Sequence, residues 1–216
     1  DGQAVVVANR FDRRDEKFFI PYDLVAQTWT APKHHPLYRL NELTAANENR
    51  PVIITEGEKC ADAIARLGYV STTTFGGAHA AHKTDLSPLR GRNIILWPDK
   101  DDAGAKYGKG LAVTLHREFR TLPKIVPTSD FSLRNVTYGT EPGTPPPNVT
   151  YQKGWDAADA IEEGWGVTEI NALLSQAVPF NMPRVSTVNH DEALPILENM
   201  ELWHTPDRKP FASIKQ

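Results

Sequence analysis

The chain has 216 residues, of which 40% are hydrophobic and 24% are charged, as in ordinary globular proteins. Its formal net charge of −3 argues against a protein that coats nucleic acid by charge alone, because such proteins are usually basic. The single cysteine, Cys60, excludes an internal disulfide and a zinc site of several cysteines, so we expect a reducing, cytoplasmic setting, and no apolar run is long enough to predict a membrane span.

Residues 1–50 predict a small β-rich subdomain. VVVANRF and KFFIPYD are rich in β-branched and aromatic residues and flank a charged turn, RRDE, which is typical of a hairpin. A short helix is expected in LYRLNELTAA. Basic residues gather near the turn, where they either contact phosphate or form a solvated hairpin tip: Arg10, Arg13, Arg14 and Lys17.

From residue 51 the pattern alternates between strands and helices. PVIITEG, YVSTTTFGG, NIILWPD and LPKIVP are expected strands, and EKCADAIARLG and AGAKYGKGLAVTLHREF are expected helices. Continuous apolar strands that alternate with helices indicate an α/β fold, a parallel sheet of about four strands with helices on both faces. Such a sheet places its functional site at the carboxyl ends of its strands.

The last third of the chain predicts an insertion and a helical extension. Residues 127–153 are rich in Pro, Gly and Thr and are expected to form a loop or insertion. DAADAIEEGW and TEINALLSQA predict two short helices, and residues 178–190 read as irregular. We therefore expect a catalytic domain over 51–176 and a linker or the start of a downstream domain over 177–216. Because both ends stop in structured-looking sequence, we expect a fragment of a longer protein.

Three carboxylates stand directly after predicted strands. Glu56 ends the first strand, and Asp99 and Asp101 end the third. Because parallel strands end at one edge of a sheet, we expect these side chains to converge there and to suit Mg²⁺, which prefers oxygen ligands. Such an ion neutralises phosphate charge and activates an attacking oxygen. The alternative for the Asp99–Asp101 pair is a solvated turn or a helix N-cap.

These motifs carry a resemblance to a known domain. VIITEG followed by IILWPDKDDAG resembles the TOPRIM domain, in which an apolar strand ending in Glu-Gly precedes a strand ending in Asp-x-Asp and small residues. The likeness covers roughly residues 51–128. TOPRIM domains are shared by bacterial primases, type IA and type II topoisomerases and some nucleases. The chain is most similar to the primase part of bacteriophage and mobile-element primase-helicases, in which a strand pair like VVVANRFDRRDEKFF precedes the Glu motif.

The resemblance implies a primase-type nucleotidyltransferase within a larger replication protein. Its expected partners are a single-stranded DNA template, NTPs and a helicase domain or protein, and its expected cofactor is Mg²⁺ or Mn²⁺. Glu56 would be the general acid or base or a metal-proximal carboxylate, and Asp99 and Asp101 would bind the ions. Primases carry a third acidic motif, commonly Asp-Pro-Asp, where this chain has DAAD. Either Asp156 or Asp159 would complete a second ion site, or Asp156 is a plain N-cap.

Two lysines are candidates for contacting phosphate, and two functions other than that of a primase remain as alternatives. Lys59 and Lys100 adjoin the acidic motifs and are placed to contact phosphate, although Lys100 could equally point to water. A TOPRIM nuclease would cleave DNA without added NTPs. A non-catalytic nucleic-acid-binding module of a primase-helicase would bind equally well in EDTA. GAKYGKG has the wrong spacing and no Ser or Thr for a P-loop, and Cys60 reads as a buried small residue.

Overall fold

The structure is a computed structural model that describes residues 4–13, 16–32, 35–76, 83–128 and 152–182. Most of the expected insertion at 127–153, most of residues 177–216 and Arg14 lie outside these ranges. The chain divides into two units, Asp1–Phe180 and Asn181–Gln216. Nearly all described residues belong to the first unit. Within them, no helix has both the length and the apolar character that crossing a membrane requires.

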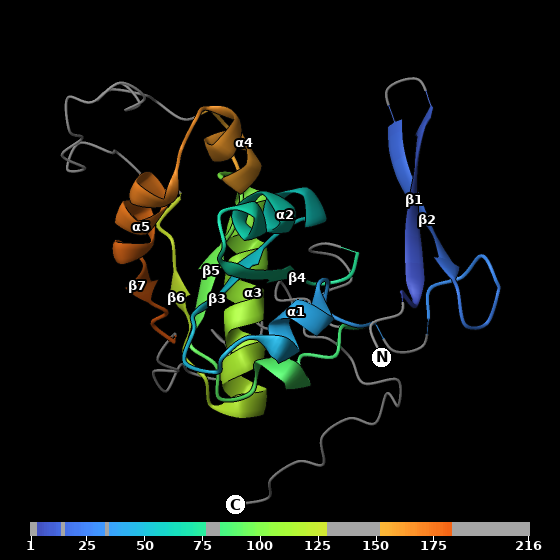
Figure 1. Ribbon diagram of the computed structural model, residues 1–216, viewed down its shortest axis with the longest axis horizontal. Coiled ribbons are helices and arrows are strands. Elements are labelled where there is room, and N and C mark those ends of the chain that lie inside the picture. The colour runs from blue at the N-terminus through green and yellow to red at the C-terminus, as the bar shows by residue number, and fades with distance from the viewer. Residues whose placement is uncertain (1–3, 14–15, 33–34, 77–82, 129–151, 183–216) are drawn as a thin grey trace, which may run out of the picture. The chain divides into compact units, whose positions relative to one another are not determined.

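Apart from the short elements η2 and β7, the described elements follow the order that the sequence predicts (Figure 1). The strands are β1 (Val6–Arg13), β2 (Glu16–Asp23), β3 (Val52–Thr55), β4 (Val70–Thr73), β5 (Ile94–Trp97), β6 (Lys124–Ile125) and β7 (Val178–Pro179). The helices are α1 (Leu40–Ala45), α2 (Glu58–Arg66), α3 (Asp102–Phe119), α4 (Ala157–Glu162), α5 (Val167–Ser175) and the short 3-10 helix η2 (Ser87–Leu89). The GAKYGKG segment lies inside α3, as its pattern indicates.

The main sheet has five strands in the order β4-β3-β5-β6-β7. β3 pairs in parallel with β4 and β5, and β5 with β6, which confirms the predicted parallel sheet of about four strands. β7 joins the edge antiparallel to β6, so the prediction of irregular chain from residue 178 is wrong at its start. β7 has only two residues, Val178 and Pro179, which are too few to show a periodic pattern. Its position at the edge of the sheet is one where a strand tolerates proline.

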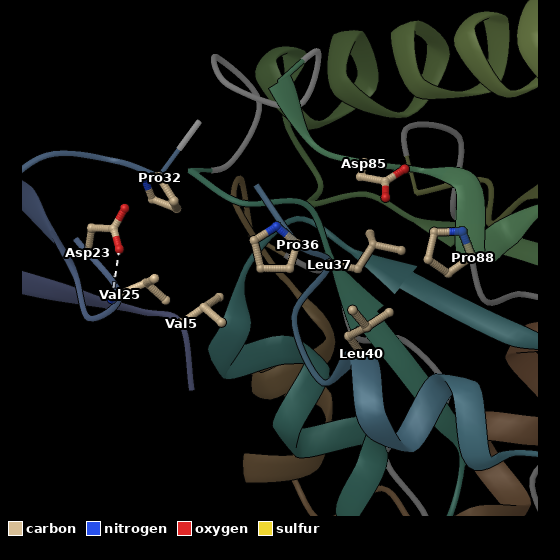
Figure 2. A pocket seen from close by; sticks show the side chains of 9 residues that line it. All are labelled: Val5, Asp23, Val25, Pro32, Pro36, Leu37, Leu40, Asp85 and Pro88. Atoms are coloured by element: carbon tan, nitrogen blue, oxygen red, sulfur yellow. Dashed lines mark hydrogen bonds between the residues drawn. The ribbon is translucent and has the colours of Figure 1, made fainter. Parts of the chain in front are cut away.

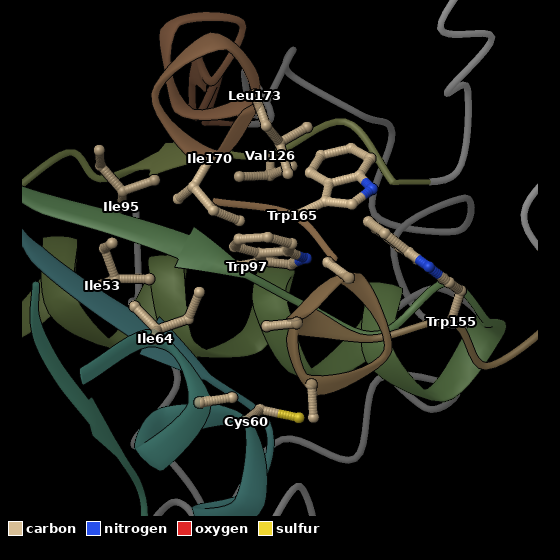
Figure 3. Packing of buried hydrophobic residues seen from close by; sticks show 14 of the residues in the cluster. Ile53, Cys60, Ile64, Ile95, Trp97, Val126, Trp155, Trp165, Ile170 and Leu173 are labelled. Carbon is tan, nitrogen blue, oxygen red and sulfur yellow. The ribbon is translucent and has the colours of Figure 1, made fainter. Parts of the chain in front are cut away.

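Side chains of the parallel strands alternate between two faces, and helices cover both. Ile53, Ile95 and Trp97 lie on one face in a core cluster with side chains of α2, α4 and α5 (Figure 3). Ile54 and Leu96 lie on the other face with side chains of α3 and α1. Strands buried on both sides in this way read as continuous apolar runs, which is why their positions were predictable. The predicted covering of both faces is confirmed.

β1 and β2 form a separate antiparallel two-stranded sheet, as the hairpin pattern predicts. Phe11 and Phe18 pair across the strands, and their rings stack with centroids 5.5 Å apart. Three basic candidates lie on these strands: Arg10, Arg13 and Lys17.

The connection from β2 to α1 borders a mostly apolar pocket (Figure 2). Val25, Pro36 and Leu40 contribute to its lining, and Asp23 tightens the turn after β2 by accepting the Val25 N–H at 2.9 Å. None of the acidic candidates lines this pocket.

Candidate metal centre

The first acidic residue, Glu56, leaves the sheet directly after β3 and is followed by Gly57, the N-cap of α2. The Thr55 hydroxyl donates to the Gly57 carbonyl at 3.1 Å. The Thr55 carbonyl in turn accepts a hydrogen bond from the buried Tyr107 hydroxyl at 3.3 Å. Tyr107 also shares a hydrogen bond with Thr74 at 3.0 Å. One side chain of α3 thus ties together the carboxyl ends of β3 and β4, beside Glu56.

The second acidic motif forms a tight turn between β5 and α3. The Asp101 N–H donates to the Asp99 carbonyl at 2.9 Å, and Asp101 Oδ1 accepts the Gly104 N–H at 2.7 Å. Asp101 is therefore the N-cap of α3, one of the alternatives that the sequence left open. Gly104 is buried against this turn, and a Cβ there would lie 2.3 Å from the Asp99 carbonyl oxygen. Only glycine lets α3 begin so close to Asp99.

The third acidic segment is joined to the second through the main chain. The Lys100 N–H donates to the Trp155 carbonyl, and the Gly154 N–H donates to the Lys100 carbonyl, both at 2.9 Å. The Trp155 ring also packs near Trp97, with centroids 6.0 Å apart (Figure 3). This bridge brings Asp156, the residue after Trp155, to the carboxyl end of β5.

Asp156 and Asp159 begin α4 as a capping box. Asp156 Oδ1 accepts the N–H groups of Ala158 and Asp159 at 2.7 and 2.8 Å. Asp159 Oδ2 accepts the Asp156 N–H at 3.1 Å. Asp156 is thus the N-cap of α4, and its role as an ion ligand stays a prediction. Both hydrogen bonds by which Asp156 caps α4 are accepted by Oδ1, so Oδ2 takes no part in the cap.

Asp99 is the electrostatic centre of the group. Burial raises its pKa to about 7, and repulsion from the other carboxylates adds to the shift. Those carboxylates, in decreasing order of effect, belong to Glu56, Asp156, Asp101 and Asp159. The other four acidic candidates therefore all act on the charge of Asp99, although the five come from three separate segments of the chain.

This donor set fits a hard divalent cation. Carboxylate oxygens are the preferred ligands of Mg²⁺ and suit Mn²⁺, and a cation would relieve the repulsion that raises the Asp99 pKa. Ligand atoms of Asp99, Asp156 and Cys60 lie within 4.8 Å of one another. Burial raises the pKa of the Cys60 thiol to about 12, with a further contribution from Asp156, so its sulfur is uncharged. The predicted burial of Cys60 is confirmed, but its place beside two carboxylates was not predicted.

The two lysine candidates both lie near the acidic segments. Lys59 Nζ pairs with Glu162 of α4 at 3.0 Å, and both side chains are largely exposed. The hydrogen bond to Glu162 raises the Lys59 pKa, and the charges of Asp156 and Asp159 act in the same direction. An exposed pair of this kind stabilises the fold little, so Lys59 can exchange Glu162 for another anion at small cost. Lys100 is half-buried.

Comparison with known proteins finds weak structural likeness only. No protein-family model and no curated protein matches the sequence. A DnaG primase catalytic domain bound to single-stranded DNA has a TM-score of 0.48 and 17% identity, over 88% of this chain and 55% of that one. A DnaG catalytic core has a TM-score of 0.45 and 17% identity, over 81% and 53%.

A third solved structure is a complex of bacteriophage T7 lagging-strand DNA polymerase with the primase domains of two gp4 subunits, an RNA/DNA hybrid and dTTP. Its similar chain has a TM-score of 0.36 and 17% identity, over 62% of this chain and 58% of that one. This chain thus spans a little more than half the length of the matching chain in each of these structures.

Proposed function

We propose that this chain is a TOPRIM-type, metal-dependent nucleotidyltransferase, the core of a primase that makes primers on single-stranded DNA from NTPs. The observation that carries the proposal is the convergence of four other carboxylates on Asp99, from the ends of β3 and β5 and the start of α4. The order and spacing of VIITEG and IILWPDKDDAG support it.

The residues divide into three roles under this proposal. Asp99, Asp101 and Asp156 would hold Mg²⁺ or Mn²⁺, which when bound neutralises triphosphate charge and activates the attacking hydroxyl. Glu56, at the end of the adjacent strand, would exchange a proton with the reacting oxygens or contact the ion. Basic side chains would hold the phosphates of the NTP and the template: Lys59, Lys100, Arg10, Arg13, Arg14 and Lys17. A helicase would supply the single-stranded template.

Asp101→Asn tests the reaction without removing the helix cap, because an amide oxygen still accepts the Gly104 N–H. We expect primer synthesis from labelled NTPs on single-stranded DNA, with Mg²⁺ or Mn²⁺, to fall by roughly 10- to 100-fold. The unfolding temperature in EDTA should change little. Asp102→Asn is the matched control, since Asp102 is the exposed next residue of the same helix turn.

Three outcomes of this assay would contradict the proposal. The wild-type chain could make no primer, Asp101→Asn could make primer at the wild-type rate, or Asp102→Asn could lose as much activity as Asp101→Asn. Cleavage of DNA without added NTPs would instead favour a nuclease on the same site. Binding of nucleic acid that is unchanged by EDTA, with no turnover, would favour a non-catalytic module.

Asp156→Asn and Asp159→Asn distinguish the two candidates in the third acidic segment. We expect Asp156 to be the ligand, because its carboxylate lies in one group with that of Asp99 and acts more strongly on the Asp99 pKa. Asp156→Asn keeps the cap and should weaken Mn²⁺ binding by about 10- to 100-fold in calorimetric titration. Asp159→Asn should weaken it far less. The reverse order of losses would assign the ligand to Asp159.

A further inference from the structure

The sulfur of Cys60 lies at the acidic centre although it belongs to the core. Its side chain is 5% exposed and packs in the cluster beneath α4 (Figure 3). Cys60 Sγ, one Asp99 oxygen and one Asp156 oxygen all lie within 4.8 Å of one another. The three atoms make a mixed donor set of one sulfur and two oxygens, supplied by α2, the β5–α3 turn and the start of α4.

The main chain holds these donors in place. Asp156 Oδ1 is bonded to two N–H groups of α4, and the Lys100–Trp155 bridge fixes the start of α4 against the β5–α3 turn. Around a tetrahedral zinc ion, ligand atoms lie roughly 3.3–3.8 Å apart. The observed separations are at most 4.8 Å, and rotation of the Asp99 side chain can close any excess over this range while Asp156 stays in its cap.

We propose that Cys60 determines which divalent ions the centre accepts, and that its sulfur, together with Asp99 and Asp156, binds a thiophilic ion of the Zn²⁺ class in competition with Mg²⁺ or Mn²⁺. Soft sulfur ligands select such ions, whereas hard ions bind carboxylates and leave the thiol alone. When the metal–sulfur bond forms, the S–H bond breaks and its proton passes to solvent, with no change of oxidation state. The competition rests on the proposed function, while binding of the thiophilic ion does not.

Cadmium reports this binding directly, because a thiolate bound to Cd²⁺ absorbs in the near ultraviolet and Cys60 is the only cysteine of the chain. We expect CdCl₂ to produce this absorption at one ion per chain, and ZnCl₂ to displace Mn²⁺ measured by its paramagnetic resonance signal. Cys60→Ser and Cys60→Ala should abolish the absorption and weaken the Zn²⁺ competition by about 10- to 100-fold. Both variants should keep their affinity for Mn²⁺.

Each alternative outcome overturns the inference. A folded wild-type chain without the cadmium absorption would show that the sulfur is out of reach. Absorption that persists unchanged in the Asp99→Asn/Asp156→Asn double variant would show that the thiol binds alone. Loss of Mn²⁺ affinity in both Cys60 variants would reduce Cys60 to a packing residue. Failure of the wild type to bind Mn²⁺ would contradict the proposed function instead, and the cadmium result would still decide the role of Cys60.

Discussion

Asp99→Asn will stabilise the chain in EDTA at pH 8 and will abolish the stabilisation that Mn²⁺ gives the wild type. Asp99 is pushed toward its protonated form by burial and by four neighbouring carboxylates, so its charge opposes folding when no cation is present. After allowance for solvent screening we expect a gain of about 2 kcal/mol, or roughly 4–8 °C in Tm. Primer synthesis should fall on the order of 1000-fold, because the central carboxylate is lost.

The pH dependence of this gain follows from the direction of the shift. The pKa of Asp99 is about 7 in the folded chain and near its ordinary 3.8 in the unfolded chain. Between these values the folded state keeps a proton that the unfolded state has lost, so the stability of the metal-free wild type falls as pH rises from about 4 to 7. Asp99→Asn lacks this dependence, and its advantage should shrink as pH falls toward 4.

Metal reverses the order of the two proteins. With Mn²⁺ at about 100 times its dissociation constant the wild type gains roughly 2.7 kcal/mol, and Asp99→Asn gains almost nothing. Thermal unfolding with and without Mn²⁺ at several pH values measures both effects. Asp102→Asn, a change of the same kind on the exposed side of the turn, should keep the metal-induced shift. The prediction would be contradicted if Asp99→Asn had a lower Tm than the wild type in EDTA at pH 8, or if Mn²⁺ raised its Tm as much as that of the wild type.

The convergence of the first two acidic motifs was predictable because the sheet is simple to read. β3 and β5 are buried along their whole length and appear as continuous apolar runs. Parallel strands end at one edge, so Glu56 and Asp99 had to follow neighbouring strand ends once both strands were assigned. Their charge interaction in the structure is the consequence.

The third acidic segment, which contains Asp156, was harder to place from the sequence. The contacts that position it are made by the main chain, so they leave no pattern of side chains. A long Pro-rich stretch separates it from β6, and the bridge that returns it to the site is made of main-chain hydrogen bonds between Lys100, Gly154 and Trp155. From the sequence, helix N-cap and metal ligand were alternative roles for Asp156. The structure shows that one carboxylate can cap a helix through Oδ1 and still lie beside Asp99.

Two supporting residues were missed for different reasons. Tyr107 has the pattern of any buried helix residue, and only the structure shows its hydroxyl bonded to the ends of β3 and β4. Gly104 did offer a signal. A glycine within a helix costs about 1 kcal/mol relative to alanine, so its place two residues after DKDD indicates a steric demand at that point.

Gly104→Ala will unfold the start of α3 from the acidic turn. The added methyl carbon would lie 2.3 Å from the carbonyl oxygen and 2.8 Å from the nitrogen of Asp99. Both are main-chain atoms, which cannot rotate away as a flexible side chain would. We expect a loss of about 3 kcal/mol or more in urea unfolding. Because relief of the clash displaces Asp99 and breaks the Asp101 cap, Mn²⁺ affinity should fall with stability.

Two other glycines of α3 provide matched controls on one helix. A Cβ at Gly110 meets no atom within 4 Å, so Gly110→Ala should stabilise the chain by up to about 1 kcal/mol. A Cβ at Gly108 would touch the Pro98 ring at 3.4 Å, which predicts a small effect. Equal stability of Gly104→Ala and Gly110→Ala would show that α3 does not begin against Asp99. A Gly104→Ala chain that is destabilised but binds Mn²⁺ normally would separate the packing of this turn from the metal site, and the close approach of helix and carboxylate would then serve the fold alone.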